Sequence, residues 1–140
     1  MQKEMKNKNC IFCEIVDKKR KSLIIDENEN SICFLDLNPM EKGHCLVITK
    51  KCCKNILDLT KKEIISINEL TKRVCVSLQK KIGSKGFNII NNFNKVAGQV
   101  IEHYHLHIIP KYQEKYGFNW TKNKPFYQET PKQVWREIKK

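Results

Sequence analysis

The sequence predicts an α+β domain in which a mainly antiparallel five-stranded sheet is covered by one long helix and a short C-terminal helix. Three observations predict this class. Five short runs of strand-forming residues are spread along the 140-residue chain. One stretch of about 22 residues carries apolar residues at helical spacing. In the last strand-forming run, three histidines alternate with apolar or aromatic residues, which is the period of a strand and not of a helix.

The strands are expected where apolar and β-branched residues cluster between turn-forming residues. The first two flank the Asn-containing segment 27–30, which predicts a hairpin. Pro110 is expected to stop the last strand, because proline cannot donate a hydrogen bond to a sheet ladder. The predicted strands are residues 22–26, 31–35, 43–49, 86–92 and 100–109.

The long helix should begin after Thr60, which has a Glu three residues later in the spacing of a capping box. It should end at Gly83. Its apolar face is predicted to lie on the sheet and comprises Ile64, Ile67, Leu70, Thr71, Val74, Leu78 and Ile82. Thr130 and Pro131 mark the start of the short last helix, through an N-cap hydroxyl and a proline at the first helical position.

The length and the 40% content of hydrophobic residues suit a single domain. We expect a flexible tail over residues 1–9, the folded domain over residues 10–115, and an extension over residues 116–140 that packs on the domain or on a dimer partner. The N-terminal segment lacks the apolar region of a signal peptide, and no apolar run approaches the ~20 residues of a membrane span. A cytoplasmic protein without a membrane partner is therefore expected.

The net charge of +12 favours phosphate-bearing partners. The basic residues are nevertheless spread along the sequence and are not gathered in one segment, so a nucleic-acid surface is not expected. The seven cysteines are an odd number in a chain without an export signal. Free thiols or metal ligands are thus favoured over a disulfide framework.

The histidine row is the strongest chemical signal in the chain. On a strand, His103, His105 and His107 would line one surface about 6.5 Å apart. The intervening side chains would face the core: Tyr104, Leu106 and Ile108. A neutral imidazole in such a row can attack phosphorus, while a neighbouring imidazolium offsets charge on the phosphate oxygens. The residues alone leave two alternatives open, a metal cluster of three imidazoles and a purely structural strand.

The surrounding motifs narrow these alternatives. The stretch from His103 to Ile109 has the His-φ-His-φ-His-φ-φ pattern of the histidine triad family, where φ is an apolar residue. The chain resembles this family, and its Hint-like branch in particular, over roughly residues 10–120. The supporting motifs occur in the family's order: Cys10 to Ile15, Phe34 to Asp36, Gly43 to Ile48, Phe87 to Asn92, and Ala97 to Gln99.

The resemblance implies a homodimeric nucleotidyl hydrolase that acts at the α-phosphate of a nucleotide. By similarity, His105 is the nucleophile that forms a covalent nucleotidyl-histidine, His107 binds the phosphate or leaving group, and His44 completes the catalytic cluster with His103. Asn92 and Gln99 match phosphate-contacting or orienting positions, and Asp36 matches the carboxylate that accepts from ribose hydroxyls. Five further positions match the apolar base pocket, although core packing explains some of them equally well: Ile11, Phe12, Ile15, Phe34 and Leu37.

The chain departs from the family pattern at two positions. Val100 replaces a Ser or Glu of many relatives, so only its backbone N–H can contact phosphate. Cys52 stands where relatives usually have the histidine of a Pro-Lys-x-His motif. In relatives with an N-terminal Cys-x-x-Cys, that histidine binds structural zinc together with the cysteine pair and the first triad histidine. The corresponding ligands here are Cys10, Cys13, Cys52 and His103, a Cys₃His set that zinc accepts; free thiols and a small buried cysteine are the alternative.

The expected substrate is a purine nucleoside phosphoramidate or a related nucleotide conjugate. Hydrolysis of dinucleoside polyphosphates by the same nucleophile is a second enzymatic possibility. A non-catalytic nucleotide- or nucleic-acid-binding module is the third, suggested by the charge and by the aromatic residues after Lys111.

Overall fold

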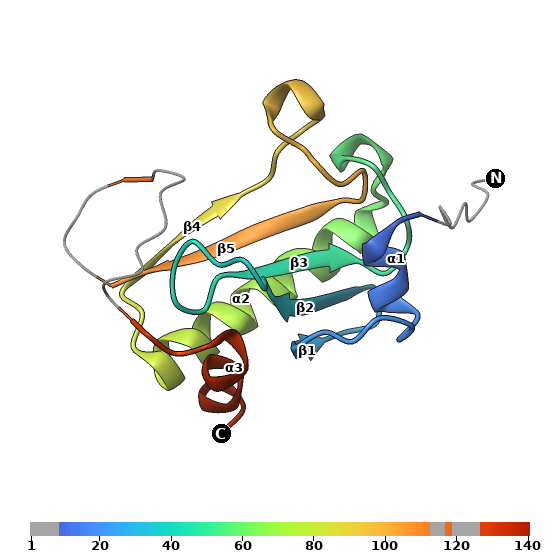
Figure 1. Cartoon of the computed structure of the whole chain (residues 1–140). Helices are drawn as coiled ribbons and strands as arrows, with labels where there is room; N and C mark the ends of the chain where they lie inside the picture. The colour runs from blue at the N-terminus through green and yellow to red at the C-terminus, as the bar shows by residue number, and fades with distance from the viewer. Residues whose placement is uncertain (1–8, 113–116, 119–126) are drawn as a thin grey trace.

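The computed structural model describes residues 9–112, 117–118 and 127–140. Five antiparallel strands form one sheet in the order β1-β2-β3-β5-β4 (Figure 1). The strands are β1 (Ile24–Glu27), β2 (Ser31–Leu35), β3 (Cys45–Thr49), β4 (Gly86–Ile90) and β5 (His105–Lys111). The predicted α+β class with a five-stranded antiparallel sheet is confirmed. Residues 1–8 of the tail predicted over residues 1–9, and most of the segment 113–126, lie outside the described residues.

The two predicted helices are present, the long one with both predicted ends and the short one with its predicted start. Helix α2 (Lys61–Ile82) is capped by Thr60, whose side chain accepts from the Glu63 N–H while the Glu63 carboxylate accepts from the Thr60 N–H. It stops at Gly83, which has a left-handed backbone (φ 72°). Helix α3 (Pro131–Lys139) begins with a second capping box, made by Thr130 and Gln133.

Side chains alternate between two apolar clusters on the two faces of the sheet. Helices α2 and α3 cover one face, where β2, β3 and β5 contribute Cys33, Leu35, Cys45, Val47, Leu106 and Ile108. The short helix α1 (Ile11–Val16) covers the other face, where it packs on Ile32, Phe34, Leu46 and Ile48. In Figure 1, α1 lies on one side of the sheet and α2 on the other. The two faces of the sheet therefore have different surroundings: one is covered by α2 and α3, and the other by α1.

Four details differ from the prediction. Helix α1 was not expected, because its N-cap is Cys10, whose Sγ accepts from the Cys13 N–H in place of the usual hydroxyl or carboxylate. Ile64 is not in the core, since its position on α2 turns toward solvent and Ser66 and Glu63 are buried there instead. The histidine strand begins at His105 and not at residue 100. It also continues through Pro110, because β3 starts only at Cys45, opposite Ile108, so no β3 residue needs the N–H that proline lacks.

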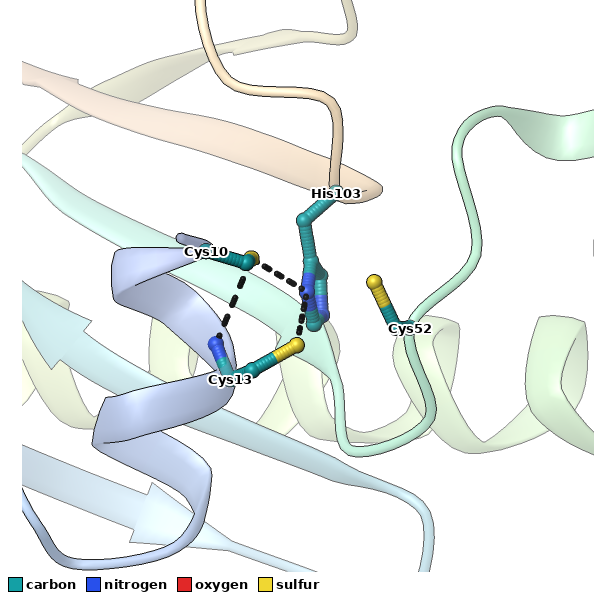
Figure 2. A group of neighbouring side chains, drawn as sticks. All are labelled: Cys10, Cys13, Cys52 and His103. Atoms are coloured by element: carbon teal, nitrogen blue, oxygen red, sulfur yellow. Dashed lines mark hydrogen bonds between the residues drawn. The ribbon is translucent and has the colours of Figure 1, made fainter. Parts of the chain in front are cut away.

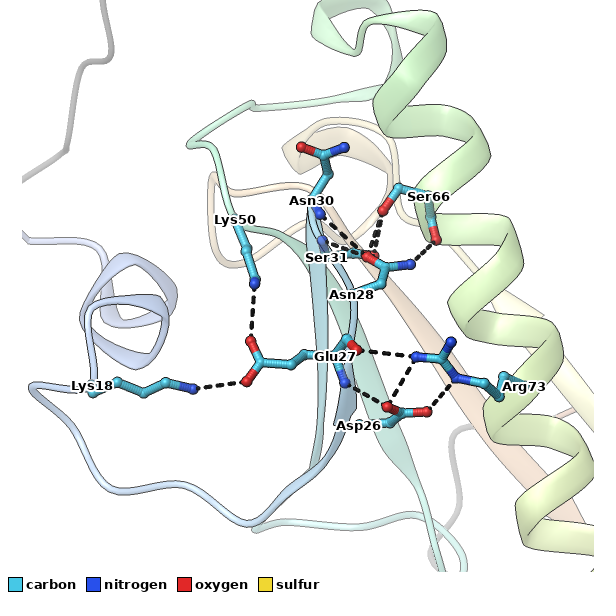
Figure 3. Close-up of polar contacts among 9 residues, drawn as sticks. All are labelled: Lys18, Asp26, Glu27, Asn28, Asn30, Ser31, Lys50, Ser66 and Arg73. Carbon is cyan, nitrogen blue, oxygen red and sulfur yellow. Dashed lines mark hydrogen bonds and ion pairs between the residues drawn. The ribbon is translucent and has the colours of Figure 1, made fainter.

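A polar network fastens the β1–β2 hairpin to α2 (Figure 3). The Asn28 side-chain oxygen accepts from the hydroxyls of Ser31 and Ser66, each at 2.6 Å. Arg73 donates to both carboxylate oxygens of Asp26, at 2.6 and 3.0 Å. The hairpin is thus fixed on the helix by hydrogen bonds as well as by apolar packing.

Of the helices in the described part of the chain, none has the length and apolar character needed to cross a bilayer.

Candidate active site and metal centre

The catalytic candidates lie on the sheet face that α1 covers. His105 and His107 stand directly opposite Ile48 and Leu46 of β3, and residues opposite one another in an antiparallel pair share a face. Their ring centroids are 5.1 Å apart. The intervening residues lie in the core beneath α2, as predicted: Tyr104, Leu106 and Ile108. The alternation expected from the sequence therefore holds within the strand itself.

His103 precedes the strand, in a turn where its N–H donates to the Ile101 carbonyl at 2.9 Å. Its fully buried ring is bound on both sides. Nε2 lies 2.6 Å from the Thr49 carbonyl, and Nδ1 faces the sulfurs of Cys10 at 3.3 Å and Cys13 at 3.5 Å. The three imidazoles are thus not an evenly spaced row, because the first one is drawn toward the N-terminal cysteines.

His105 is oriented by a hydrogen bond from its Nδ1 to the His103 carbonyl at 2.7 Å. A carbonyl can only accept, so Nδ1 carries the proton of the neutral ring and Nε2 carries a lone pair. The edge of Phe12 packs against the ring, with centroids 5.1 Å apart and planes at 77°. The backbone and an aromatic neighbour thus fix both the tautomer and the plane of this imidazole.

His107 belongs to a chain of hydrogen bonds that begins in the loop between β2 and β3. The Met40 N–H donates to His44 Nδ1 at 3.0 Å, so the proton of neutral His44 is on Nε2. That Nε2 lies 3.0 Å from His107 Nδ1 and donates to it. The remaining proton of neutral His107 is consequently on Nε2. His105 and His107 therefore present opposite functions, a lone pair on the first and an N–H donor on the second.

Burial keeps these imidazoles neutral. It lowers the pKa of His107 to about 3, and the repulsion that protonated His105 and His44 would exert lowers this pKa further. Burial also lowers the pKa of His44, against the attraction of Asp36, and that of His105, against the hydrogen bond to His103. The tautomers deduced from the hydrogen bonds are those of neutral rings, so the two observations agree.

The other predicted nucleotide contacts occupy different surroundings. Asp36 lies 3.7 Å from His44 Nε2 and accepts from the Asn38 N–H. Gln99 is buried, and its amide binds three backbone groups of the nearby loops, those of Asn94, Lys54 and Ile101. Asn92 is half-buried and lies near the Gly98 carbonyl, whereas the Val100 side chain is 90% exposed.

The five residues matched to a base pocket divide into two groups. Phe12, Ile15 and Phe34 are buried in the cluster between α1 and the sheet. Ile11 and Leu37 are exposed, Leu37 at 69%. Phe12, Ile15 and Phe34 are therefore core residues, which was the alternative to a base pocket. Ile11 and Leu37 supply accessible apolar surface.

The four predicted metal ligands gather in one cluster (Figure 2). One ligand atom from each of Cys10, Cys13, Cys52 and His103 lies within 4.8 Å of the other three. Cys10 and Cys13 come from the first turn of α1, Cys52 from the segment after β3, and His103 from the turn before β5. Cys53, although adjacent to Cys52, is directed to Glu63 on α2.

The donor set fits a structural zinc ion. Three thiolates and one imidazole are common zinc ligands. The Thr49 carbonyl binds His103 Nε2, so the tautomer leaves Nδ1 free of a proton on the side of the thiols, which is the usual second-sphere arrangement for a metal-bound histidine. Although burial opposes it, hydrogen bonding with His103 and the Cys13 N–H lowers the pKa of Cys10 to about 7, which favours the thiolate.

Some contacts at the site have no clear signal in the sequence. Asn91 donates its side-chain N–H to the His105 carbonyl at 3.0 Å, which fixes the strand position of that residue. Its place next to Asn92 is the only hint of this role in the sequence. The Thr49 carbonyl and the Met40 N–H are backbone groups, which no residue pattern can reveal.

The site and sheet define a class: an α+β domain with an ordered cluster of neutral histidines beside a cluster of three cysteines and a histidine that could hold a metal. The HIT domain model matches residues 17–114, and the chain belongs to the HIT family. An uncharacterised HIT-like protein of Mycoplasma genitalium is 40% identical over 116 residues, which cover 83% of this chain and 82% of that protein.

Two further relatives bear on the activity and on the metal. The adenosine 5'-monophosphoramidase of Schizosaccharomyces pombe is 35% identical over 139 aligned residues and 90% of each chain. The crystal structure of a zinc-bound histidine triad family protein from Mycobacterium smegmatis superposes with a TM-score of 0.81 at 25% identity, over 94% of this chain and 91% of that one.

Proposed function

We propose that the protein is a nucleotidyl hydrolase that cleaves purine nucleoside phosphoramidates or related nucleotide conjugates at the α-phosphate. The observation that supports this most directly is the pair of opposite tautomers at His105 and His107. A lone pair and an N–H donor side by side are what attack on a phosphate and stabilisation of its oxygens require. The similarity to an adenosine 5'-monophosphoramidase supports the P–N bond as the one cleaved.

In the proposed reaction His105 Nε2 attacks the α-phosphorus, and the bond to the leaving group breaks. A covalent nucleotidyl-histidine forms, and the leaving amine takes a proton from solvent. His107 Nε2–H would donate a hydrogen bond to a phosphate oxygen or to that leaving group. Water then attacks phosphorus and gives up a proton to solvent, the P–N bond to His105 breaks with its electron pair returning to Nε2, and the nucleoside monophosphate is released. The His103 carbonyl stabilises the positive charge on His105 in the intermediate, because it holds the Nδ1 proton.

The remaining site residues are proposed to position the nucleotide. Asp36 would accept from the ribose hydroxyls, and Asn92 with the Val100 N–H would contact the phosphate. Ile11 and Leu37 offer the exposed apolar surface for the base, next to the buried Phe12, Ile15 and Phe34. Gln99 would act through the loop it holds, because its amide groups bind backbone atoms.

We further propose that Cys10, Cys13, Cys52 and His103 hold structural zinc, which would supply a rigid link between α1, the end of β3 and the turn before β5. A homodimer in the cytoplasm is proposed as the working form. The outer strand β4 supports a dimer, because its exposed Ile89 lies on an edge of the sheet that no other described strand covers.

The decisive experiment is to trap the intermediate. Brief incubation of the wild type with adenosine phosphoramidate, followed by a denaturing quench at mildly alkaline pH where a phosphorus–histidine bond survives, should add one adenylyl group to the intact mass, and His105→Ala should abolish both the adduct and turnover. Affinity for AMP should persist in His105→Ala, which excludes misfolding as the cause. Turnover retained by His105→Ala would reject the assignment. A rate with diadenosine polyphosphates above that with the phosphoramidate would replace the proposed substrate with the dinucleotide.

A further inference from the structure

The excess positive charge of the described residues lies on one side of the fold. The helical layer consists of α2 with the residues up to Lys85, and α3 with Lys140. It carries eleven lysines and arginines against three glutamates, and all eleven are exposed. The rest of the described chain holds ten basic and ten acidic residues. The even spread along the sequence is therefore misleading, because folding places the excess charge on the helices.

Most of these cations lack a carboxylate partner within the described residues. Arg73 is neutralised by Asp26, and Lys62 lies 3.8 Å from Glu29 on an exposed surface. The other nine on the helical layer form no ion pair with a described residue: Lys61, Lys72, Lys80, Lys81, Lys85, Lys132, Arg136, Lys139 and Lys140. Favourable placement near helix C-termini accounts for Lys80, Lys81 and Arg136, but not for Lys72, Lys85 or Lys132.

A cavity of about 220 Å³ opens in this layer where β1, α2 and α3 meet. Lys81, Lys139 and Lys140 line it together with Ser77 and Asp26. The charge of Asp26 is already balanced by the bidentate contact with Arg73. The cavity therefore presents three cations and a hydroxyl to an incoming group, which suits a phosphate.

We propose that the helical layer binds the phosphate backbone of double-stranded nucleic acid, with one backbone phosphate in the cavity lined by Lys81, Lys139 and Lys140. Helix α2 has 22 residues and is about 33 Å long, close to one turn of a duplex. The layer lies on the sheet face opposite the histidines, so the bound duplex and a nucleotide substrate would not compete.

Two features favour a duplex over other polyanions. Single-stranded nucleic acid is bound largely by stacking on exposed aromatic rings. The aromatic residue of the described helical layer is Trp135, which is half-buried and donates its N–H to the Ile24 carbonyl. A membrane surface would require an apolar face that inserts between lipids. The apolar faces of α2 and α3 are instead buried in the core.

The test measures anisotropy of a labelled 20-base-pair duplex against salt concentration, in the presence of excess AMP to occupy the histidine site. We expect a Kd on the order of 10 µM at low salt and a steep salt dependence. The double variant Lys81→Glu, Lys140→Glu should bind at least ten-fold more weakly, with a smaller salt slope. The matched control Lys19→Glu, Lys21→Glu makes the same change in net charge on the exposed segment before β1 and should bind within about three-fold of the wild type.

Four results would overturn the proposal. Equal weakening by both double variants would assign binding to net charge alone. Displacement of the duplex by AMP would assign it to the histidine site. Tighter binding of a single strand of equal charge, or binding to vesicles containing phosphatidylserine without binding to the duplex, would replace the ligand. Phosphoramidate hydrolysis of both variants should match the wild type, and both should still unfold cooperatively above the assay temperature, although Lys81→Glu loses a favourable charge at the end of α2. This separates the test from that of the hydrolase.

Discussion

The two ends of the histidine cluster are held in different ways. At one end, the His103 ring is fully buried, contacts sulfur with Nδ1 and binds a strand carbonyl with Nε2. At the other end, His107 is half-buried, and its tautomer depends on a relay from Met40 through His44. The two histidines are therefore expected to serve separate purposes, because different groups bind their rings. We expect the first end to control stability and the second to control chemistry.

The largest expected effect comes from removing a thiol at the His103 end. Cys13→Ala should abolish zinc binding and lower the free energy of unfolding by about 3 kcal/mol or more, because metal binding contributes directly to folding. Zinc content and thermal unfolding check this. A chelator should lower the melting temperature of the wild type but not that of the variant. The control is Cys75→Ala on α2, which should retain zinc. A wild type without zinc and indifferent to chelator would contradict the assignment.

An intermediate effect is expected from acid at the His107 end. The pKa of His107 is about 3 in the folded chain, against an ordinary value of 6.5. The unfolded chain therefore binds more protons between these values, and stability must fall as the pH drops from 6.5 toward 3. Relative to its stability at pH 7, His107→Asn should lose about 1 kcal/mol less than the wild type at pH 4.5. Urea unfolding at both pH values measures the difference, and parallel losses would refute it.

The smallest effect should come from the loop that carries His44. Lys42 is largely buried and pairs with Glu129 and with Glu137 of α3, at 3.3 and 3.1 Å. Lys42→Met keeps the aliphatic packing but frees the loop from α3, so kcat should fall about two- to five-fold with a stability loss of about 1 kcal/mol or less. Lys18→Met, which removes an exposed pair with Glu27, is the control and should leave kcat unchanged. Equal kcat values for the two variants would show that α3 does not position the relay.

Local signals in the sequence predicted much of the fold. The capping box at Thr60 was recognisable because Glu63, three residues later, completes it, and the start of α3 was recognisable from the Thr130 hydroxyl and Pro131. The alternation around Leu106 identified the two faces of β5. Helix α1 escaped prediction because a cysteine sulfur is its cap. These outcomes show that elements defined by neighbouring side chains can be read from the chain alone.

The features of the site that depend on backbone groups or on long-range packing could not be predicted from the sequence. The residues of the histidine and cysteine clusters were identified, but the turn at His103 was not, because it depends on contacts with Cys10 and Thr49. The tautomers required the Met40 N–H and the His103 carbonyl. The positive charge of the helical layer was not predicted for a related reason, since its two segments, residues 61–85 and 131–140, come together only after folding.

The carbonyl of His103 has an evolutionary consequence. It fixes the tautomer of His105, the proposed nucleophile, and this group is common to every amino acid. The ring of His103, in contrast, is needed only for its contacts with Thr49, Phe12 and the thiols. A substitution at residue 103 that preserves the local turn would thus remove a proposed metal ligand and leave the orienting hydrogen bond in place. Descendants of this chain could then exchange their means of stabilisation while inheriting the same orientation of residue 105.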